Sequence, residues 1–208
     1  MRIVLFANTG LGNEVLKALI NKGVDILLVV TRKLEGNFPY YAEQELNVLC
    51  EEKGIEVRTN INVNNIEFKK HLLSLNLDLI IVASFHQIIK EDIIDIPRNG
   101  IINFHPSLLP KYRGPSPIIS VLLNGEEFTG VTVHRLIKEL DAGAIMHQVK
   151  YKIDPLQNLG SLFKELSLLA GLMTLDIVEL FKNNLVQYIE QDEENMTYFP
   201  KPIGYDII

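Results

Sequence analysis

Residues 101–117, IINFHPSLLPKYRGPSP, carry an apolar strand directly into a loop that contains four prolines. Side chains on a strand point the same way at every second residue, so Asn103 and His105 are predicted to share one face. The prolines exclude both a continued central strand and an ordinary helix after His105. The stretch therefore predicts two polar side chains held together at the carboxyl end of a buried strand, beneath a stiff loop.

Short apolar runs alternate with amphipathic segments through the first half of the chain. The runs predict buried strands at 2–7, 24–30, 55–59, 77–84 and 100–105. The segments between them predict helices at 13–23, 40–54 and 63–76. Strands that are apolar throughout and alternate with helices indicate a parallel sheet covered on both faces. Because crossovers are right-handed, we expect an α/β domain with a mostly parallel, twisted, doubly wound sheet.

The pattern changes after the proline loop. A short helix is predicted at 118–125, and two strands follow at 130–136 and 144–153. Only seven residues separate these strands, which is too few for a helical crossover, so the pair is predicted to be antiparallel. An apolar stripe from Leu159 to Phe181 then predicts one long helix.

The composition is that of a soluble globular protein. The 208 residues are 47% hydrophobic and carry a net charge of −6, which argues against a large nucleic-acid-binding surface. The length favours one domain, predicted over 1–190, with a tail over 191–208. The start does not resemble a signal peptide, and no apolar run approaches the roughly 20 residues of a membrane span. We therefore expect a cytoplasmic protein without a membrane segment.

Several polar segments begin where predicted parallel strands end, which is where open sheets bind ligands. They are the turn at 8–12, the segment at 84–87 and the proline loop. The connection at 137–143, which contains Asp141 and Gly143, is expected to hang at the same edge. Gly143 would free the backbone there.

Asn103, His105 and Asp141 could together catalyse transfer of an acyl group. A neutral imidazole can take a proton from a nucleophile and return it to a leaving group. A carboxylate beside it stabilises the charged ring, and an amide N–H stabilises oxygen charge developing on a carbonyl. No GxSxG motif supplies a nucleophile, so direct transfer between two bound partners is predicted. From spacing alone, a histidine and an asparagine that only satisfy the loop remain an equal alternative.

INFHPSLLPKYRG, followed by TGVTVHRL and LDAGAI, closely resembles the N10-formyltetrahydrofolate-dependent formyltransferases. Their shared pattern is N-x-H-P-S-L-L-P with a catalytic aspartate in a later D-x-G turn. The resemblance implies a Rossmann-like formyltransferase fold, N10-formyltetrahydrofolate as cosubstrate, and catalysis by Asn103, His105 and Asp141. LDLIIVASFHQII also resembles the strand and loop that line the folate site in these enzymes. The folate-binding residues implied are Ser84, Phe85, His86, Gln87, Ile88, Leu140 and Gly143.

The resemblance implies a primary amine as acceptor, and three subclasses of the family compete. KYRGPSPI is closer to the methionyl-tRNA and amino-sugar enzymes than to the glycinamide ribonucleotide enzymes. Methionyl-tRNA enzymes continue into a further domain where this chain stops, so a nucleotide-linked 4-amino-4,6-dideoxy sugar is the expected acceptor. The predicted acceptor-binding residues are Thr9, Gly10, Gly12, Tyr112 and Arg113. The alternatives are glycinamide ribonucleotide, methionyl-tRNA or a catalytically silent binding domain, and the question of a homodimer stays open.

Three other features are not assigned a function. ANTGLGNEVL holds Gly10 and Gly12 in G-x-G, but Val15 stands where a dinucleotide motif needs its third glycine, so NAD(P) binding is not expected. No His, Asp or Glu cluster has metal-site spacing, so no metal is expected. His134 falls in a strand pattern and is predicted to be a structural or surface histidine.

Overall fold

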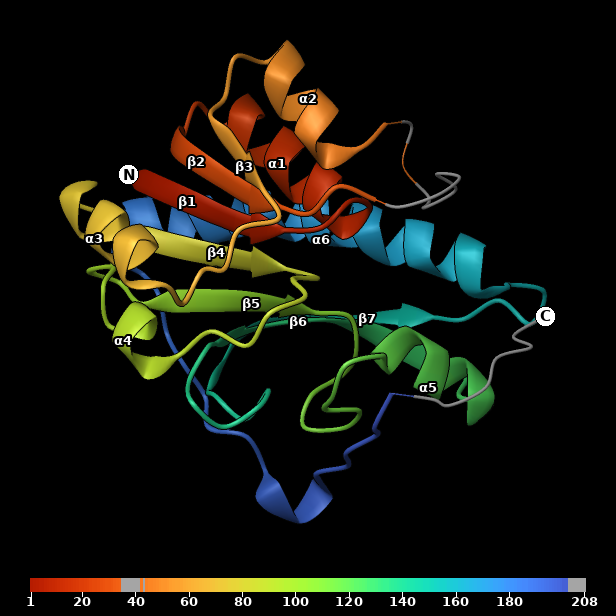
Figure 1. Ribbon diagram of the computed structural model, residues 1–208. Coiled ribbons are helices and arrows are strands. Elements are labelled where there is room, and N and C mark those ends of the chain that lie inside the picture. The colour runs from red at the N-terminus through yellow and green to blue at the C-terminus, as the bar shows by residue number, and fades with distance from the viewer. Residues whose placement is uncertain (35–41, 43, 202–208) are drawn as a thin grey trace.

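A seven-stranded sheet forms the centre of the protein (Figure 1). The computed structural model describes residues 1–34, 42 and 44–201. The strands are β1 (Arg2–Ala7), β2 (Asp25–Thr31), β3 (Val57–Thr59), β4 (Leu79–Ala83), β5 (Ile101–His105), β6 (Phe128–Arg135) and β7 (Ile145–Lys152). Their order is β3-β2-β1-β4-β5-β6-β7. The first five strands are parallel, whereas β6 is antiparallel to both β5 and β7, so the predicted mixed sheet is confirmed.

Helices cover both faces of this sheet, as the sequence predicted. They are α1 (Leu11–Asn21), α2 (Leu46–Glu52), α3 (Ile66–Ser74), α4 (Glu91–Ile94), α5 (Pro117–Leu123) and α6 (Leu159–Lys182), with a 3-10 turn η1 (Glu193–Asn195). Ile3 and Leu5 of β1 belong to the core shared with α1, α2 and α6. Val4 and Phe6 belong to the core shared with α3 and α4. Burial on both faces explains why the strands are continuous apolar runs.

The start of α2 departs from the predicted helix at 40–54. Residues 35–41 and 43 lie outside the described part of the chain, but Gln44 and Glu45 are not helical. Glu45 is extended, and the Leu46 backbone N–H donates to the Thr9 hydroxyl at 3.0 Å. Because this side-chain acceptor satisfies an N–H at the helix terminus, the helix begins at Leu46. The four-residue α4 was not predicted, since a single turn shows no periodicity.

The strand order reverses between β1 and β4, and Asn8 lies at that point. Its backbone N–H donates to the carbonyl oxygen of Ala83 at 3.2 Å, and its Nδ2 donates to that of Ser84. Ligands of doubly wound sheets bind at the carboxyl edge of such a reversal. Asn8 Oδ1 is buried there without a hydrogen-bond partner among the described residues.

The face of the sheet that carries α3 and α4 also carries the two polar side chains of β5. Ile101 belongs to the core on that face, and Asn103 and His105 follow it at alternate positions. These side chains therefore extend from the core toward the carboxyl edge.

Among the described helices, none is long and apolar enough to cross a membrane.

Candidate active site

His105 ends β5 with its two ring nitrogens in different environments. Its side chain is buried, and Nε2 lies 2.8 Å from the carbonyl oxygen of Tyr112 in the proline loop. A carbonyl oxygen can only accept, so Nε2 carries the hydrogen and a neutral His105 keeps its free lone pair on Nδ1. Nδ1 faces Asp141 Oδ1 at 3.6 Å. The loop therefore sets the tautomer and leaves the Nδ1 lone pair free.

Asp141 reaches His105 by a route that the sequence did not indicate. Leu136 still pairs with Ile101, at the opposite end of β5 from His105. The 137–143 connection therefore leaves the sheet at that end and folds back over its face, whereas we expected it at the carboxyl edge. Asp141 has a left-handed backbone with φ 52°, and its Oδ2 accepts a 2.9 Å bond from the Gly114 N–H. Its side chain is only 9% exposed.

Gly143 is required for close packing, which corrects the expected reason for a glycine there. It is not among the residues with positive φ. A Cβ at this position would instead overlap the carbonyl oxygen of Arg135. The end of the loop can thus lie directly against β6, which holds Asp141 over the sheet.

His134 is part of this site, although the sequence predicted only a structural or surface histidine. It stands opposite Asn103 in the β5–β6 register, with Nε2 3.1 Å from Asn103 Nδ2 and 3.7 Å from Asp141 Oδ1. Burial and the neighbouring His105 lower the pKa of His134 to about 4, so the ring is neutral at pH 7. No sequence signal marks this contact, because it depends on which residues of two strands face each other.

Gln191, at the start of the predicted tail, links the 137–143 connection to the proline loop. Its Nε2 donates to the carbonyl oxygens of Asp141 at 2.7 Å and Gly143 at 2.8 Å. Its Oε1 accepts from Arg113 Nε at 3.1 Å and Nη2 at 2.8 Å. Gln191 is buried, and three of these four bonds are buried while the one to Asp141 is partly buried. No sequence pattern marks this residue, since the tail shows little periodicity.

Tyr112 and Arg113, both predicted to bind the acceptor, make extensive contacts within the protein. Arg113 is 6% exposed, and its guanidinium also donates to Glu193, with the shortest bond at 2.6 Å. The Tyr112 hydroxyl donates to Glu126 at 2.6 Å, and its ring stacks on Phe199 with centroids 4.9 Å apart. Burial and Glu126 raise the pKa of Tyr112. Their roles toward an acceptor stay predictions.

The predicted folate loop, residues 84–88, follows β4. It contains an exposed apolar side chain and a polar side chain that is hydrogen-bonded to the neighbouring segment. Ser84 has a left-handed backbone, and the Phe85 ring packs 5.3 Å from Phe6. Gln87 donates from Nε2 to the carbonyl oxygen of Ile61 and accepts at Oε1 from Val63, so it braces the neighbouring segment. Ile88 and, in the 137–143 connection, Leu140 are 80% and 53% exposed. Both connections therefore leave a large apolar side chain open to solvent.

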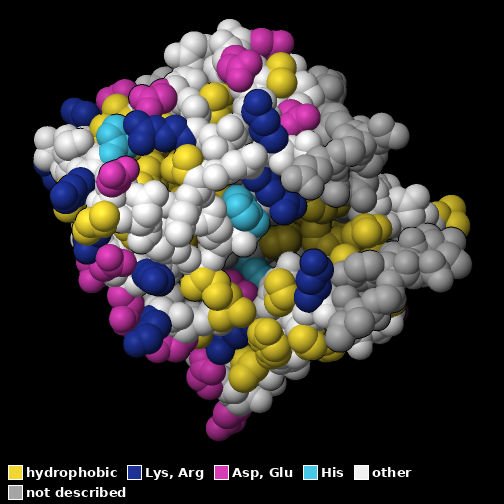
Figure 2. All heavy atoms as spheres, in the orientation of Figure 1, with side chains coloured by type: hydrophobic (Ala, Val, Ile, Leu, Met, Phe, Trp, Pro, Cys, Tyr) yellow, Lys and Arg dark blue, Asp and Glu magenta, His cyan; other side chains and the backbone are white. Residues whose placement is uncertain are grey.

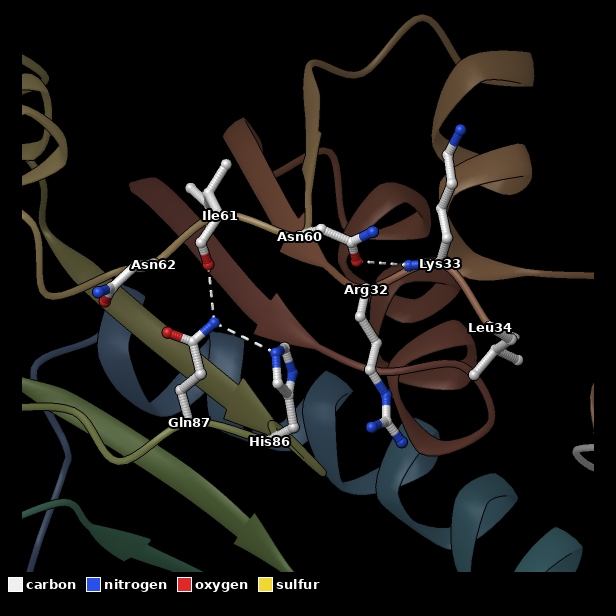
Figure 3. Close-up of a pocket in the computed structure, with 8 residues that line it drawn as sticks. All are labelled: Arg32, Lys33, Leu34, Asn60, Ile61, Asn62, His86 and Gln87. Atoms are coloured by element: carbon white, nitrogen blue, oxygen red, sulfur yellow. Dashed lines mark hydrogen bonds between the residues drawn. The ribbon is translucent and has the colours of Figure 1, made fainter.

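A cavity of about 560 Å³ opens beside this loop, at the carboxyl ends of β2, β3 and β4 (Figure 3). Its lining residues are Arg32, Lys33, Leu34, Asn60, Ile61, Asn62, His86 and Gln87. Burial and Arg32 lower the pKa of His86. No acidic side chain occurs among these described lining residues, so the cavity favours an anion.

A family model described as formyl transferase matches residues 1–171. The chain belongs to the formyl transferase family. A methionyl-tRNA formyltransferase from Thermotoga neapolitana is 39% identical over 202 residues, covering 96% of this chain and 64% of the relative. One from Agathobacter rectalis is 32% identical, covering 99% of this chain and 68% of the relative. This formyl transferase chain thus spans about two thirds of the length of these relatives.

Solved structures confirm the Rossmann-like formyltransferase fold. An N-formyltransferase from Helicobacter canadensis, in complex with folinic acid and dTDP-3-aminofucose, has a TM-score of 0.77 at 19% identity, covering 96% of this chain and 70% of that one. A phosphoribosylglycinamide formyltransferase from Bacillus halodurans has a TM-score of 0.74 at 19% identity, covering 88% of this chain and 97% of that one. At these identities the likeness concerns the fold alone.

The turn after β1 of this formyl transferase is engaged in packing. Thr9 caps α2, and the Gly10 N–H donates to Asn13 Oδ1 at 2.9 Å. Gly10 has φ 99°, and a Cβ there would overlap the Phe163 ring. A Cβ on Gly12 would lie 2.7 Å from that of Ala7. These contacts explain the residue types without a ligand, and acceptor binding by Thr9, Gly10 and Gly12 stays a prediction.

One face of the formyl transferase is hollowed (Figure 2). Figure 2 shows a histidine and basic side chains on one side of an opening whose floor is hydrophobic, with a further histidine deeper inside. Within the described part of the chain, no group of three or more His, Cys, Asp or Glu side chains could hold a metal ion.

We expect Gln191→Ala to destabilise the protein by about 2 to 4 kcal/mol in urea unfolding, because it leaves buried partners of a hydrogen-bond network unsatisfied. Amide hydrogen exchange should also accelerate in the 137–143 connection. Glu193→Ala is the matched control, since it removes an exposed partner of the same Arg113 and should cost less than about 1 kcal/mol. Equal effects of the two substitutions would contradict a bracing role for Gln191.

Proposed function

We propose that the chain transfers a formyl group from N10-formyltetrahydrofolate to a primary amine. The observation that carries the proposal is the position of His105 Nδ1, which faces the Asp141 carboxylate at 3.6 Å on the strand that also carries Asn103. The three side chains lie on one face of the sheet, near its carboxyl edge. Membership of the formyl transferase family supports the same chemistry.

In the proposed reaction the neutral amine attacks the formyl carbon, and a bond from the amine nitrogen to that carbon forms. The carbonyl oxygen gains negative charge, which an N–H of the Asn103 amide stabilises. His105 Nδ1 takes the proton that the amine nitrogen releases, and Asp141 stabilises the charged ring. The bond from carbon to N10 then breaks, and the proton passes to N10. The products are the formamide and tetrahydrofolate.

His105→Ala should lower kcat at least about a hundredfold, because it removes the group that moves the proton. Asn103→Ala should lower kcat by about a hundredfold to a thousandfold, because it removes a donor to the developing oxyanion. Both are measured in a formyl-transfer assay with N10-formyltetrahydrofolate. His71→Ala, a change at a histidine of α3 outside the site, is the control and should retain turnover. Full turnover by either site variant would overturn the mechanism.

The donor's binding place follows from the loop and the cavity beside it. The flat ring of a reduced folate would lie between Ile88 and Leu140, whose apolar side chains are exposed. The glutamate end of the donor carries carboxylates, and the neighbouring cavity presents Arg32 and Lys33. His86 and Gln87 belong to both the loop and the cavity lining, so one extended molecule would contact both.

Folinic acid at about a hundred times its dissociation constant should raise the melting temperature by about 5 to 10 °C, since it stabilises only the native state. At the same concentration, Arg32→Gln with Lys33→Gln should reduce this shift. With an analogue that lacks the glutamate, the melting-temperature shift should be the same in this double variant as in the wild type. Arg98→Gln, at an exposed arginine outside the cavity, is the control. No shift with the wild-type protein would count against the donor.

For the acceptor, we propose the amine of a nucleotide-linked 4-amino-4,6-dideoxy sugar. The net charge of −6 supports a small acceptor over a polyanionic tRNA. The turn at 9–12 lies at the N-terminus of α1, where a diphosphate would meet favourable backbone dipoles. Methionyl-tRNA is the second candidate, because the relatives at 32% to 39% identity are methionyl-tRNA formyltransferases.

Comparison of kcat/KM among three acceptors should favour dTDP-linked 4-amino-4,6-dideoxyglucose by about a hundredfold over glycinamide ribonucleotide and methionyl-tRNA. This ratio measures discrimination in the transition state. Turnover of the sugar should also be the least sensitive to salt, because a tRNA complex releases counterions from many phosphates. A preference for methionyl-tRNA would overturn the proposed sugar acceptor but not the proposed formyl transfer.

A further inference from the structure

Asn103 and His134 are directly paired residues on neighbouring antiparallel strands. Asn103 stands opposite His134, and Phe104 stands opposite Val133. Residues opposed in this way project to the same face with their Cβ atoms about 4.5 to 5.5 Å apart. The β6–β7 register also shifts between Val133 and His134, an irregularity of the kind that re-aims a side chain. Two strands of the sheet, rather than a loop, thus set this contact.

The direction of the hydrogen bond between the two side chains follows from the partners around them. His134 Nδ1 lies 2.9 Å from the carbonyl oxygen of Arg135, which can only accept, so Nδ1 carries the hydrogen. The neutral ring then has a free lone pair on Nε2, 3.1 Å from Asn103 Nδ2. That nitrogen can accept from the amide NH2 group but cannot donate to the amide oxygen. The tautomer of His134 therefore determines which way round the Asn103 amide lies.

The charges around His134 leave it in this accepting form near neutral pH. The Asp141 carboxylate favours the protonated ring, and the Arg135 carbonyl does so through its hydrogen bond. Burial, His105 and Arg113 oppose protonation and together outweigh them. His134 is 1% exposed, so water does not compete for Nε2.

We infer that His134 is a positioning residue that turns the NH2 end of the Asn103 amide toward the reacting carbonyl. The two ends of an amide have nearly the same shape, but only the NH2 end can stabilise an oxyanion. One N–H is held by His134 Nε2, which leaves the second N–H of the same nitrogen for the formyl oxygen. Without an acceptor at position 134 the amide can turn over and present its oxygen, which repels the developing charge. The inference rests on the proposed formyl transfer.

The kinetic test uses variants that remove or retain the acceptor. With N10-formyltetrahydrofolate and dTDP-linked 4-amino-4,6-dideoxyglucose, His134→Leu should lower kcat by about tenfold to a hundredfold, the range expected for misplaced catalytic groups. Both KM values should change by less than about threefold. His134→Gln, whose carbonyl can accept from Asn103, should restore most of kcat. His147→Leu, at a partly exposed histidine of β7, is the control and should match the wild type.

A double-mutant cycle separates positioning from a purely structural role. In an Asn103→Ala background, His134→Leu should cost less than about twofold, because no amide remains to be oriented. The same loss in both backgrounds would overturn the inference, as would a His134→Gln enzyme no better than His134→Leu.

Nitrogen NMR of the wild-type protein tests the geometry without any variant or any turnover. The His134 imidazole should show hydrogen on Nδ1 and none on Nε2 at pH 7. Hydrogen on Nε2 would overturn the inference, because the Asn103 oxygen would then face His134. If the wild-type protein transfers formyl to none of the three acceptors, the proposed function fails, while this spectrum still decides how the Asn103 amide is held.

Discussion

The Asp141 carboxylate is nearly buried, and its charge requires partners from several segments that are distant in sequence. A desolvated carboxylate is costly unless hydrogen bonds and opposite charge compensate it. Gly114 donates to one oxygen, whereas His105 Nδ1 and His134 Nε2 lie 3.6 and 3.7 Å from the other and can compensate its charge only when they are protonated. The proline loop, β5 and β6 must therefore all be in place before Asp141 can occupy this position.

Two histidines beside one carboxylate have different states because their backbone partners differ. His105 donates from Nε2 to the Tyr112 carbonyl oxygen and keeps Nδ1 free, whereas His134 donates from Nδ1 to the Arg135 carbonyl oxygen and keeps Nε2 free. The free nitrogen of His105 faces the carboxylate, and that of His134 faces Asn103 more closely, at 3.1 Å. Since two rings so close are unfavourable when both are charged, the more buried His134 stays neutral. The proposed proton transfer therefore depends on His105.

The site lies on the boundary between the parallel and antiparallel parts of the sheet. The parallel strands end at one edge, where the predicted folate loop and the basic cavity lie. The antiparallel strand β6 runs back along β5, and the connection after it folds over the sheet face to deliver Asp141. The tail then crosses the proline loop, where Arg113 donates its backbone N–H to Thr197 and Phe199 donates to Arg113. Gln191 links this part of the tail to the loop that carries Asp141. The tail, which shows little sequence periodicity, therefore borders the site on one side.

The sequence by itself determined the α/β class, most strand positions and the pairing of Asn103 with His105 on one face. These features depend on local periodicity: doubly covered strands are continuously apolar, and a strand repeats every two residues. The family resemblance also implied a catalytic role for Asp141, but not its route over the sheet. Only the tertiary structure decided that His134 faces Asn103, that Gln191 braces the loop and that α2 begins where Thr9 caps it. Each of these contacts joins residues between 31 and 50 positions apart. Strand register, loop path and tail packing are set by burial summed over the whole chain, so no local pattern encodes them.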